Sequence, residues 1–156
     1  MPKQKIIDLL YELMRDSKRS DRELAKVVKV SQPTITRMRK TLEKSAYIRE
    51  YTVVPAFEKL GFEILALNFL DANVTEEFRK WISKSPKILF ACFGEGADGK
   101  ALLLVSLHKN FTDFSQFTSE IEKLFGSDIS SFKSFLSALK VDVVKHFSLK
   151  NLERVQ

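Results

Sequence analysis

The sequence predicts an α+β protein: an N-terminal three-helix (winged) helix-turn-helix domain followed by a ferredoxin-like βαββαβ domain. Apolar residues recur at spacings of three and four up to residue 44, and strand-like and helix-like patterns alternate after residue 61. The composition changes too. Residues 1–50 carry 13 Lys and Arg against 7 Asp and Glu, whereas residues 51–156 carry 13 of each and all 13 Phe. We therefore predict a helix-turn-helix domain at 1–54, a linker at 55–61 and an α+β domain at 62–156.

Two helices are expected in the first 30 residues. Residues 4–15 place Ile6, Ile7, Leu10, Leu13 and Met14 on one face of an amphipathic helix. Ser20 and Glu23 match a capping box, in which each side chain bonds the backbone amide of the other residue. A second helix should therefore begin directly after Ser20.

A third helix is expected from Ser31, a good N-cap, to about Lys44, because Pro33 is tolerated in a first turn. Its buried stripe consists of Ile35, Met38 and Leu42. The connection of about three residues to the second helix is typical of a helix-turn-helix. Residues 47–54 alternate and are rich in β-branched and aromatic residues, which predicts a strand or short wing.

The second domain is expected to alternate in type. Strands are predicted at 62–70, 88–93, 101–108 and 130–139, helices at 75–83 and 111–125, and a further strand at 141–147. The first four strands and two helices give the βαββαβ order. Strands 62–70 and 101–108 are apolar on both faces. A bare patch of that size is unusual on a monomer, so we expect two such sheets to pack face to face in a homodimer.

The net charge of +6 lies entirely in residues 1–50. Such an excess favours a polyanionic partner, although a solvated lysine-rich surface is the plainer alternative. Between residues 24 and 42 the charged residues are Lys26, Lys29, Arg37, Arg39 and Lys40, without one acid. An exposed structural helix usually mixes both signs, so this stretch favours a nucleic-acid partner.

Other classes of function have weak support. The chain has no apolar run of the roughly 20 residues that a membrane span needs, and its charged start does not suit a signal peptide. The single Cys92 cannot form an internal disulfide, and we expect it to be a buried core thiol in an intracellular protein. His108 and His146 have no partners at metal-ligand spacing, so neither metal nor cofactor is expected. No nucleophile motif, phosphate loop or carboxylate pair indicates an enzyme.

The segment ELAKVVKVSQPTITRMRKTLEKSAYIREYTVV, followed by EKLGFEILALNFL, resembles the Lrp/AsnC (feast/famine) transcription regulators. The matching residues are Glu23, Leu24, Ala25, Ser31, Thr34, Ile35, Leu42, Glu43, Ile48, Tyr51, Leu60 and Gly61. The resemblance implies a cytoplasmic protein that binds double-stranded DNA. It also implies that the βαββαβ half is the family's regulatory (RAM) domain, which forms homodimers and larger assemblies such as tetramers or octamers.

Several residues depart from the family's pattern. Lys29 stands where the family has a turn glycine between helices, and Ala46 stands where it has the glycine that starts the wing. Arg39 occupies an apolar position of the third helix and Met38 a usually polar one, an exchange that would rotate this helix slightly. The identity of the base-reading residues depends on that rotation.

The third helix carries the candidate DNA-binding residues. With Ile35, Met38 and Leu42 inward, its outward face presents the N-terminal half that a recognition helix sets into the major groove. Thr36 and Arg37 are expected to contact bases, with Gln32 and Thr34 at the margin. Lys29, Lys40 and Lys44 are expected to contact phosphates. The alternative is a solvated helix face.

The glycine-rich segment 94–99 is the candidate effector site, since the family's small effectors bind near the corresponding loop. The residues concerned are Gly94, Gly96, Asp98 and Gly99, and an amino acid would suit their amides and carboxylate. The simpler interpretation is a tight turn between two strands. Two further hypotheses remain: an architectural DNA-binding protein without a ligand, and an enzyme that decarboxylates sirohaem, a class that shares the fold but has His- and Arg-rich segments absent here.

Overall fold

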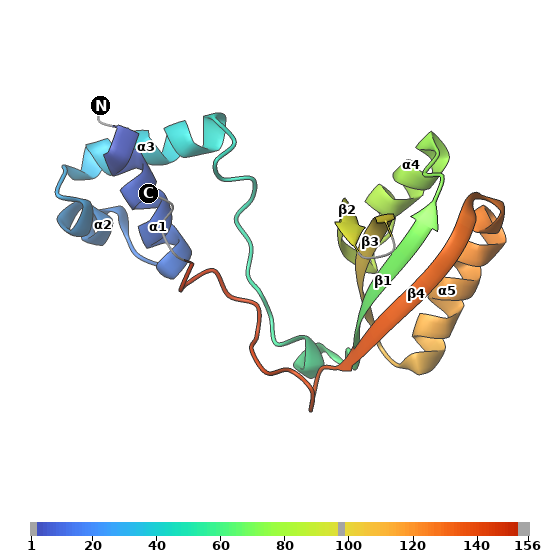
Figure 1. The fold of residues 1–156 in the computed structure, drawn as a ribbon. Helices are drawn as coiled ribbons and strands as arrows, with labels where there is room; N and C mark the ends of the chain where they lie inside the picture. The colour runs from blue at the N-terminus through green and yellow to red at the C-terminus, as the bar shows by residue number, and fades with distance from the viewer. Residues whose placement is uncertain (1–2, 97–98, 153–156) are drawn as a thin grey trace. The chain divides into compact units, whose positions relative to one another are not determined.

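The computed structural model describes residues 3–96 and 99–152, which group into two compact units (Figure 1). One unit holds the residues up to Val54 and those from His146 onward, and the other holds Pro55–Lys145. The chain end from His146, which the sequence assigned to the second domain, thus groups with the N-terminal helices.

The first unit is built from α1 (Lys3–Arg15), α2 (Asp21–Val28) and α3 (Gln32–Lys44). The expected capping box is confirmed: the Ser20 hydroxyl accepts from the Glu23 amide, and the Glu23 carboxylate accepts from the Ser20 amide at 2.8 Å. The apolar faces of the helices meet in one core, whose fully buried members are Leu9, Leu24, Ile35, Met38 and Leu42. The predicted stripe of α3 is therefore confirmed.

Among the described residues, two that are not glycine hold left-handed backbone conformations, Lys29 with φ 57° and Ala46 with φ 56°. Both stand where the Lrp/AsnC pattern has glycine. At the end of α2, the amides of Lys29 and Val30 both donate to the Ala25 carbonyl oxygen. After α3, the amides of Tyr47 and Ile48 both reach the Leu42 carbonyl oxygen. The backbone turns sharply at each helix end, although neither residue is the glycine that such a turn favours.

The strand expected at 47–54 is wrong. The segment is extended but, among the described residues, pairs with no other strand. A segment rich in β-branched and aromatic residues forms a strand only when a neighbouring strand pairs with it. Here the Tyr47 and Ile48 amides bond the end of α3 instead. Tyr51, Val53 and Val54 consequently remain exposed.

The second unit opens with a short 3-10 helix, η1 (Phe57–Leu60), in the expected linker. Then follow β1 (Ile64–Ala72), α4 (Glu76–Lys84), β2 (Ile88–Gly96), β3 (Gly99–His108), α5 (Phe111–Phe125), the short η2 (Gly126–Asp128) and β4 (Ile129–Ala138). The strands form one sheet in the order β2-β3-β1-β4, with every neighbouring pair antiparallel. The predicted βαββαβ order is confirmed.

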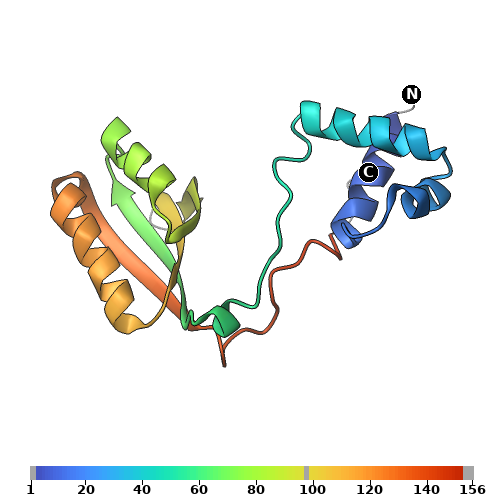
Figure 2. The same ribbon diagram turned by 180° about the vertical axis from the view of Figure 1, so that it is seen from behind.

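Helices α4 and α5 both cover the same face of this sheet, as two opposite views show (Figures 1 and 2). Their side chains pack on alternate residues of the central strands, among them Leu70 and Leu104. Phe78 of α4 is fully buried and stacks on Phe125 of α5, with ring centroids 4.2 Å apart. The N-caps Thr75 and Asn110 each accept a hydrogen bond from the helix they precede.

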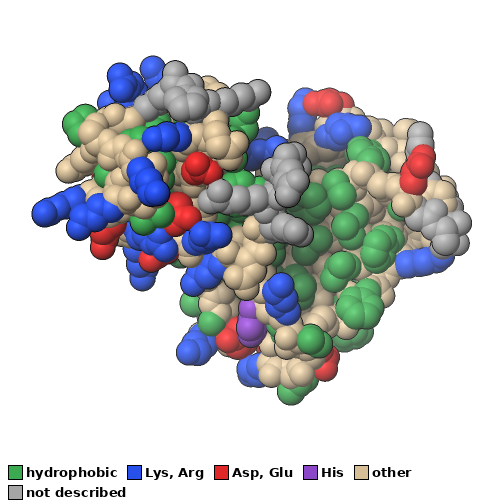
Figure 3. All heavy atoms as spheres, turned by 60° about the vertical axis from the view of Figure 1, so that its left-hand side comes forward, with side chains coloured by type: hydrophobic (Ala, Val, Ile, Leu, Met, Phe, Trp, Pro, Cys, Tyr) green, Lys and Arg blue, Asp and Glu red, His purple; other side chains and the backbone are tan. Residues whose placement is uncertain are grey.

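The opposite face of the sheet, called here the open face, carries Leu65, Leu67, Phe69, Phe90, Cys92, Leu103, Val105 and Phe135. Phe135 keeps 63% of its surface exposed and Phe90 keeps 55%. Figure 3 shows hydrophobic side chains gathered in a patch on this unit. Cys92 was expected in the core, but it is half-buried on the open face, because the strand alternates and no helix covers that side.

The further strand expected at 141–147 is also wrong. The Ala138 amide donates to the Asp142 carboxylate, and the Val141 and Asp142 amides donate to the Ala138 carbonyl oxygen, so the chain turns at the end of β4. Among the described residues the segment then has no ladder partner, and Val144 is fully exposed.

Candidate nucleic-acid interface

Helix α3 turns a continuous polar face to solvent. Ile35, Met38 and Leu42 are fully buried beneath it. The exposed residues on the other side include Gln32, Pro33, Thr36, Arg37, Lys40 and Lys44, and Thr41 and Glu43 are exposed at the edges of this face. Met38 lies in line with the other two buried residues, so the exchange of Met38 and Arg39 leaves the apolar stripe of the helix intact.

The positive charge of this face is uncompensated. In the described part of the chain, Arg37, Lys40 and Lys44 take part in no ion pair, and Lys29 adds an exposed ammonium at the turn before α3. The Lys5 ammonium lies nearby, donating to the Lys29 carbonyl oxygen at 3.1 Å. Figure 3 shows Lys and Arg side chains spread over the surface of the three-helix unit. Such a face attracts phosphates.

Two predicted contact residues use their hydroxyls inside the unit. Thr34 is half-buried, and its hydroxyl shares a hydrogen bond with that of Ser31 at 2.8 Å. The Thr36 hydroxyl donates to the Asp21 carboxylate at 2.7 Å. Thr36 is exposed on the helix, but its polar atom is already engaged.

Asp21 also receives Arg39. The Arg39 guanidinium donates to Asp21 Oδ1 from Nη2 at 2.8 Å and from Nε at 3.3 Å. Burial raises the pKa of Asp21, but the hydrogen bonds from Thr36 and Arg39 outweigh it and hold the pKa below its ordinary value. Burial lowers the pKa of Arg39, and the partners Asp21 and Tyr51 more than restore it, so the guanidinium stays charged.

Tyr51 extends this cluster to the segment that follows α3. Its hydroxyl donates to Glu43 Oε1 at 2.9 Å and interacts with Arg39. Sequence reasoning missed Asp21, Arg39 and Tyr51 as a group. Their separations of 18, 12 and 30 residues follow no helical or strand period, so only a guess at the packing of α2 on α3 would have suggested them.

The glycine-rich segment is less open than expected. The ladder between β2 and β3 continues to the pair Gly96 and Gly99, and Gly94 pairs with Ala101. The predicted loop at 94–99 is therefore wrong in extent. Residues 94–96 and Gly99 belong to the two strands, and Asp98 lies outside the described residues. Gly99 has φ 100°, which favours glycine there, and an added Cβ at Gly94 or Gly99 would meet no atom within 4 Å.

A buried polar row crosses the helix-covered side of the sheet. The Asn68 amide donates to the Ser106 hydroxyl at 3.0 Å, and the Ser134 hydroxyl donates to Asn68 Oδ1 at 2.7 Å. Ser106 and His108 Nε2 are 2.8 Å apart, whereas His108 Nδ1 lies 3.7 Å from the Asp113 carboxylate. Burial lowers the pKa of His108, more than the Asp113 carboxylate raises it. Within the described ranges, no group of His, Cys, Asp or Glu is placed to hold a metal ion.

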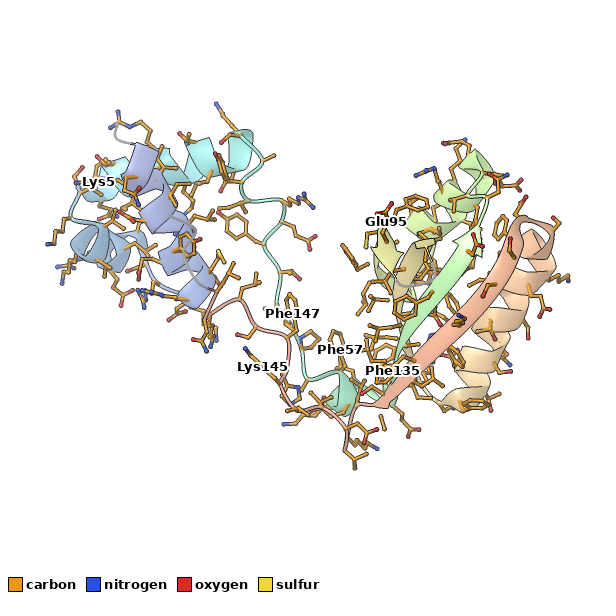
Figure 4. All side chains as sticks on the ribbon, in the orientation of Figure 1. Lys5, Phe57, Glu95, Phe135, Lys145 and Phe147 are labelled. Atoms are coloured by element: carbon orange, nitrogen blue, oxygen red, sulfur yellow. The ribbon has the colours of Figure 1, made fainter. Side chains whose placement is uncertain are left out.

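The open face is the second candidate contact surface. Phe135 projects from β4 on the side away from α4 and α5 (Figure 4). The three large exposed side chains Phe69, Phe90 and Phe135 come from three different strands. A patch of this kind on one sheet face is typical of a protein–protein contact.

Comparison with known proteins agrees with this geometry. A family model described as winged helix-turn-helix DNA-binding matches residues 3–49. An uncharacterised HTH-type transcriptional regulator of Pyrococcus abyssi is 26% identical over 141 residues, covering 89% of this chain and 92% of that protein. The HTH-type transcriptional regulator LrpC of Bacillus subtilis is 32% identical over 88 residues, covering 54% of this chain and 60% of LrpC. None of the described helices is long and apolar enough to cross a membrane.

Solved structures share the fold along nearly the whole chain. The B. subtilis LrpC structure superposes with a TM-score of 0.74 at 21% identity, covering 95% of this chain and 98% of LrpC. An AsnC family regulator from Agrobacterium tumefaciens gives 0.76 at 16% identity, and a Neisseria meningitidis regulator in complex with L-Met gives 0.77 at 18%. Each of these two covers 94% of both chains. The resemblance stated from the sequence is thus confirmed: the chain has a winged helix-turn-helix DNA-binding segment, is similar to HTH-type transcriptional regulators including LrpC, and shares the fold of the Lrp/AsnC regulators.

Proposed function

We propose that the protein reads a specific DNA sequence as a homodimer, with one α3 in each of two major grooves. The observation that carries the proposal is the exposed face of α3, on which Arg37, Lys40 and Lys44 have no ion-pair partner among the described residues. A two-fold dimer would bind inverted half-sites spaced by whole turns of about 10–10.5 bp. Such a regulator would act on DNA in the cytoplasm and would not be an enzyme.

The residues of the face divide into two roles. Arg37 is the base reader, because a guanidinium pairs bidentately with guanine, and Gln32 flanks it at the helix N-terminus. Thr34 supports the first turn through Ser31. Lys29, Lys40 and Lys44 contact phosphates, which set affinity and its salt dependence. Thr36 is not assigned to bases or phosphates in this proposal, because its hydroxyl already donates to Asp21.

The open face is the dimer contact in this proposal. Packing two copies face to face would bury Phe69, Phe90 and Phe135, which are all exposed in one chain. Obligate dimer interfaces are more apolar than transient ones and resemble a core cut in half. Further contacts between dimers would give tetramers or octamers.

An amino-acid-like effector is proposed near the tip of the β2–β3 hairpin, with Gly94, Gly96, Asp98 and Gly99 as its surroundings. The proposal is supported by the N. meningitidis regulator of the same fold, which was solved in complex with L-Met. In this chain Gly96 pairs with Gly99, and a Cβ added at Gly94 or Gly99 would meet no atom within 4 Å. The effector would bind where dimers meet at this tip.

An architectural DNA-binding protein without a ligand is the second candidate. It is favoured by the spread of basic side chains on the three-helix unit, which would suit a contact with any DNA backbone (Figure 3). The two functions differ in whether α3 discriminates bases or only holds phosphates.

Two substitutions separate these functions. Arg37→Ala should reduce affinity for a DNA sequence selected by the protein by about 1–3 kcal/mol and leave affinity for random DNA nearly unchanged. Lys40→Ala should weaken both alike and lower the slope of log K against log salt by about 0.9. Lys84→Ala, an exposed lysine of the second unit, is the matched control. Equal losses on selected and random DNA in both variants would favour the architectural function.

A further inference from the structure

The carboxylate of Asp21 joins two residues of α3 to the start of α2. Its Oδ2 accepts from Thr36 at 2.7 Å, and its Oδ1 accepts from Arg39 at 2.8 and 3.3 Å. Thr36 and Arg39 are three residues apart, so they lie on one side of α3, about one turn from each other. Because one rigid carboxylate holds both, it restricts rotation of α3 about its axis as well as sliding along it.

The apolar core beneath α3 does not supply this restriction by itself. Apolar packing is non-directional, and Met38 at the centre of the stripe is an unbranched, adaptable side chain. The bonds to Asp21 are directional and charge-assisted, so they weaken steeply when the angle changes.

Arg37 directly follows Thr36, and Lys40 directly follows Arg39. Both are exposed and have no ion-pair partner among the described residues. A rotation of α3 by about 10° would move groups at its outer radius of about 5–6 Å by about 1 Å. Recognition groups need to be held within about 0.5 Å of their productive geometry. The bonds from Thr36 and Arg39 to Asp21, called here the Asp21 clamp, therefore lie next to Arg37 and Lys40. The positions of these two side chains decide whether α3 reaches the edge of a base.

Arg39 is also connected to the segment that follows α3, through Tyr51. The Tyr51 hydroxyl donates to Glu43 Oε1 at 2.9 Å and interacts with Arg39. With Tyr51 and Glu43 beside it, Arg39 is held between Asp21 and the segment after α3, and is not available to DNA.

We infer that Asp21 is a positioning residue for base recognition: it clamps Thr36 and Arg39 so that α3 presents Arg37 at a fixed angle. Thr36 and Arg39 serve the orientation of the helix and make no contact with bases. The inference rests on the proposed sequence-reading function and adds the residues that set its selectivity. The side chains of Arg39 and Asp21 are both one-quarter exposed or less.

The test compares the affinity of full-length variants for selected and random DNA at one salt concentration. Asp21→Asn keeps the shape of the side chain and removes its charge, and Thr36→Val keeps the shape and removes the hydroxyl. Each should lower the preference for selected DNA, Asp21→Asn by about fivefold or more, the lower end of what one good base contact contributes. The slope of log K against log salt should not change, because the phosphate contacts remain. The double variant should be no worse than Asp21→Asn, because both changes break one clamp.

Asp16→Asn is the control for charge, since Asp16 is an exposed acid of the same unit that bonds Lys18 and Arg19 and not α3. It should leave the preference unchanged. The inference is overturned if Asp21→Asn and Thr36→Val change only the free energy of unfolding. It is also overturned if Thr36→Val loses discrimination at one base pair while Asp21→Asn retains it, because Thr36 would then read that base directly. If Asp21→Asn does not fold, Thr36→Val alone decides. A wild-type chain without preference for any sequence refutes the sequence-reading function itself, before any variant is compared.

Discussion

Replacing Ala46 by glycine should stabilise the three-helix unit. Ala46 is exposed with φ 56°, held there by the Tyr47 and Ile48 amides, which donate to the Leu42 carbonyl oxygen at 3.0 and 3.2 Å. A residue with a Cβ holds this conformation at a cost of about 1–2 kcal/mol. The extra freedom of glycine in the unfolded chain costs about 0.4–1 kcal/mol. The net gain is therefore about 0.5–1 kcal/mol, which raises the Tm of a small unit by about 2–8 °C.

The two units can be followed separately. Trp81 is the only tryptophan and lies in the second unit, so its fluorescence follows that unit, whereas calorimetry records both transitions. Ala46→Gly should raise the Tm of the three-helix unit and leave the Tm recorded by Trp81 fluorescence unchanged. Lys29→Gly, at φ 57°, should stabilise in the same way while weakening DNA binding, because it removes an ammonium from the proposed phosphate contacts.

Ala56 provides the matched control, because it has φ −75° and gains nothing from glycine. Ala56→Gly should lower the stability of the second unit or leave it unchanged. If Ala46→Gly and Lys29→Gly both leave the Tm of the three-helix unit unchanged or lower it, the left-handed conformation of these residues is not strained.

Three further outcomes are expected. Burial holds the pKa of His108 below its ordinary value of 6.5, so below about pH 6.5 the unfolded chain binds a proton that the folded chain does not. The free energy of unfolding of the second unit should then fall as the pH drops toward the folded-state pKa of His108, by up to about 1.4 kcal/mol per pH unit. In urea titrations between pH 7 and 5, the variant His108→Gln should not show this fall. Phe135→Lys should shift the sedimentation of the chain from dimer toward monomer with little change in its circular dichroism, and an unchanged dimer would place the contact elsewhere. Asp98→Ala should weaken any amino-acid response and leave DNA binding intact, whereas calorimetry with all twenty amino acids giving no heat in the wild type would favour the architectural function.

Sequence reasoning succeeded where the cause of structure is local. The stripe of Ile35, Met38 and Leu42 follows from a 3.6-residue period, and the capping box at Ser20 follows from residues three apart. The order of strands and helices followed from the same kind of pattern. The missing glycines at positions 29 and 46 were visible as departures, and the structure holds both residues at positive φ.

It failed where a partner decides the outcome. Residues 47–54 have the composition of a strand but no neighbour to pair with in the described chain, and the glycines at 94 and 96 pair in a ladder where glycine suggested a loop. The bond from the Thr36 hydroxyl to Asp21 was likewise not predicted. The acceptor Asp21 lies 15 residues away on another helix, and no local pattern indicates that distance.

Asn68 determines which residues of the sheet are paired. Because β1 is apolar on both faces, a slip of one residue would exchange one apolar set for another, and hydrophobic alternation alone would penalise it weakly. In the native register, Asn68 donates to Ser106 on β3 and accepts from Ser134 on β4, so one amide fixes the pairing of three strands. A slip of one residue would turn Asn68 to the open face, away from Ser106 and Ser134, and would lose two hydrogen bonds that contribute about 0.5–1.5 kcal/mol each. Polar side chains on the helix-covered face thus specify the alignment of the strands, which leaves β1 free to present Leu65, Leu67 and Phe69 on the open face.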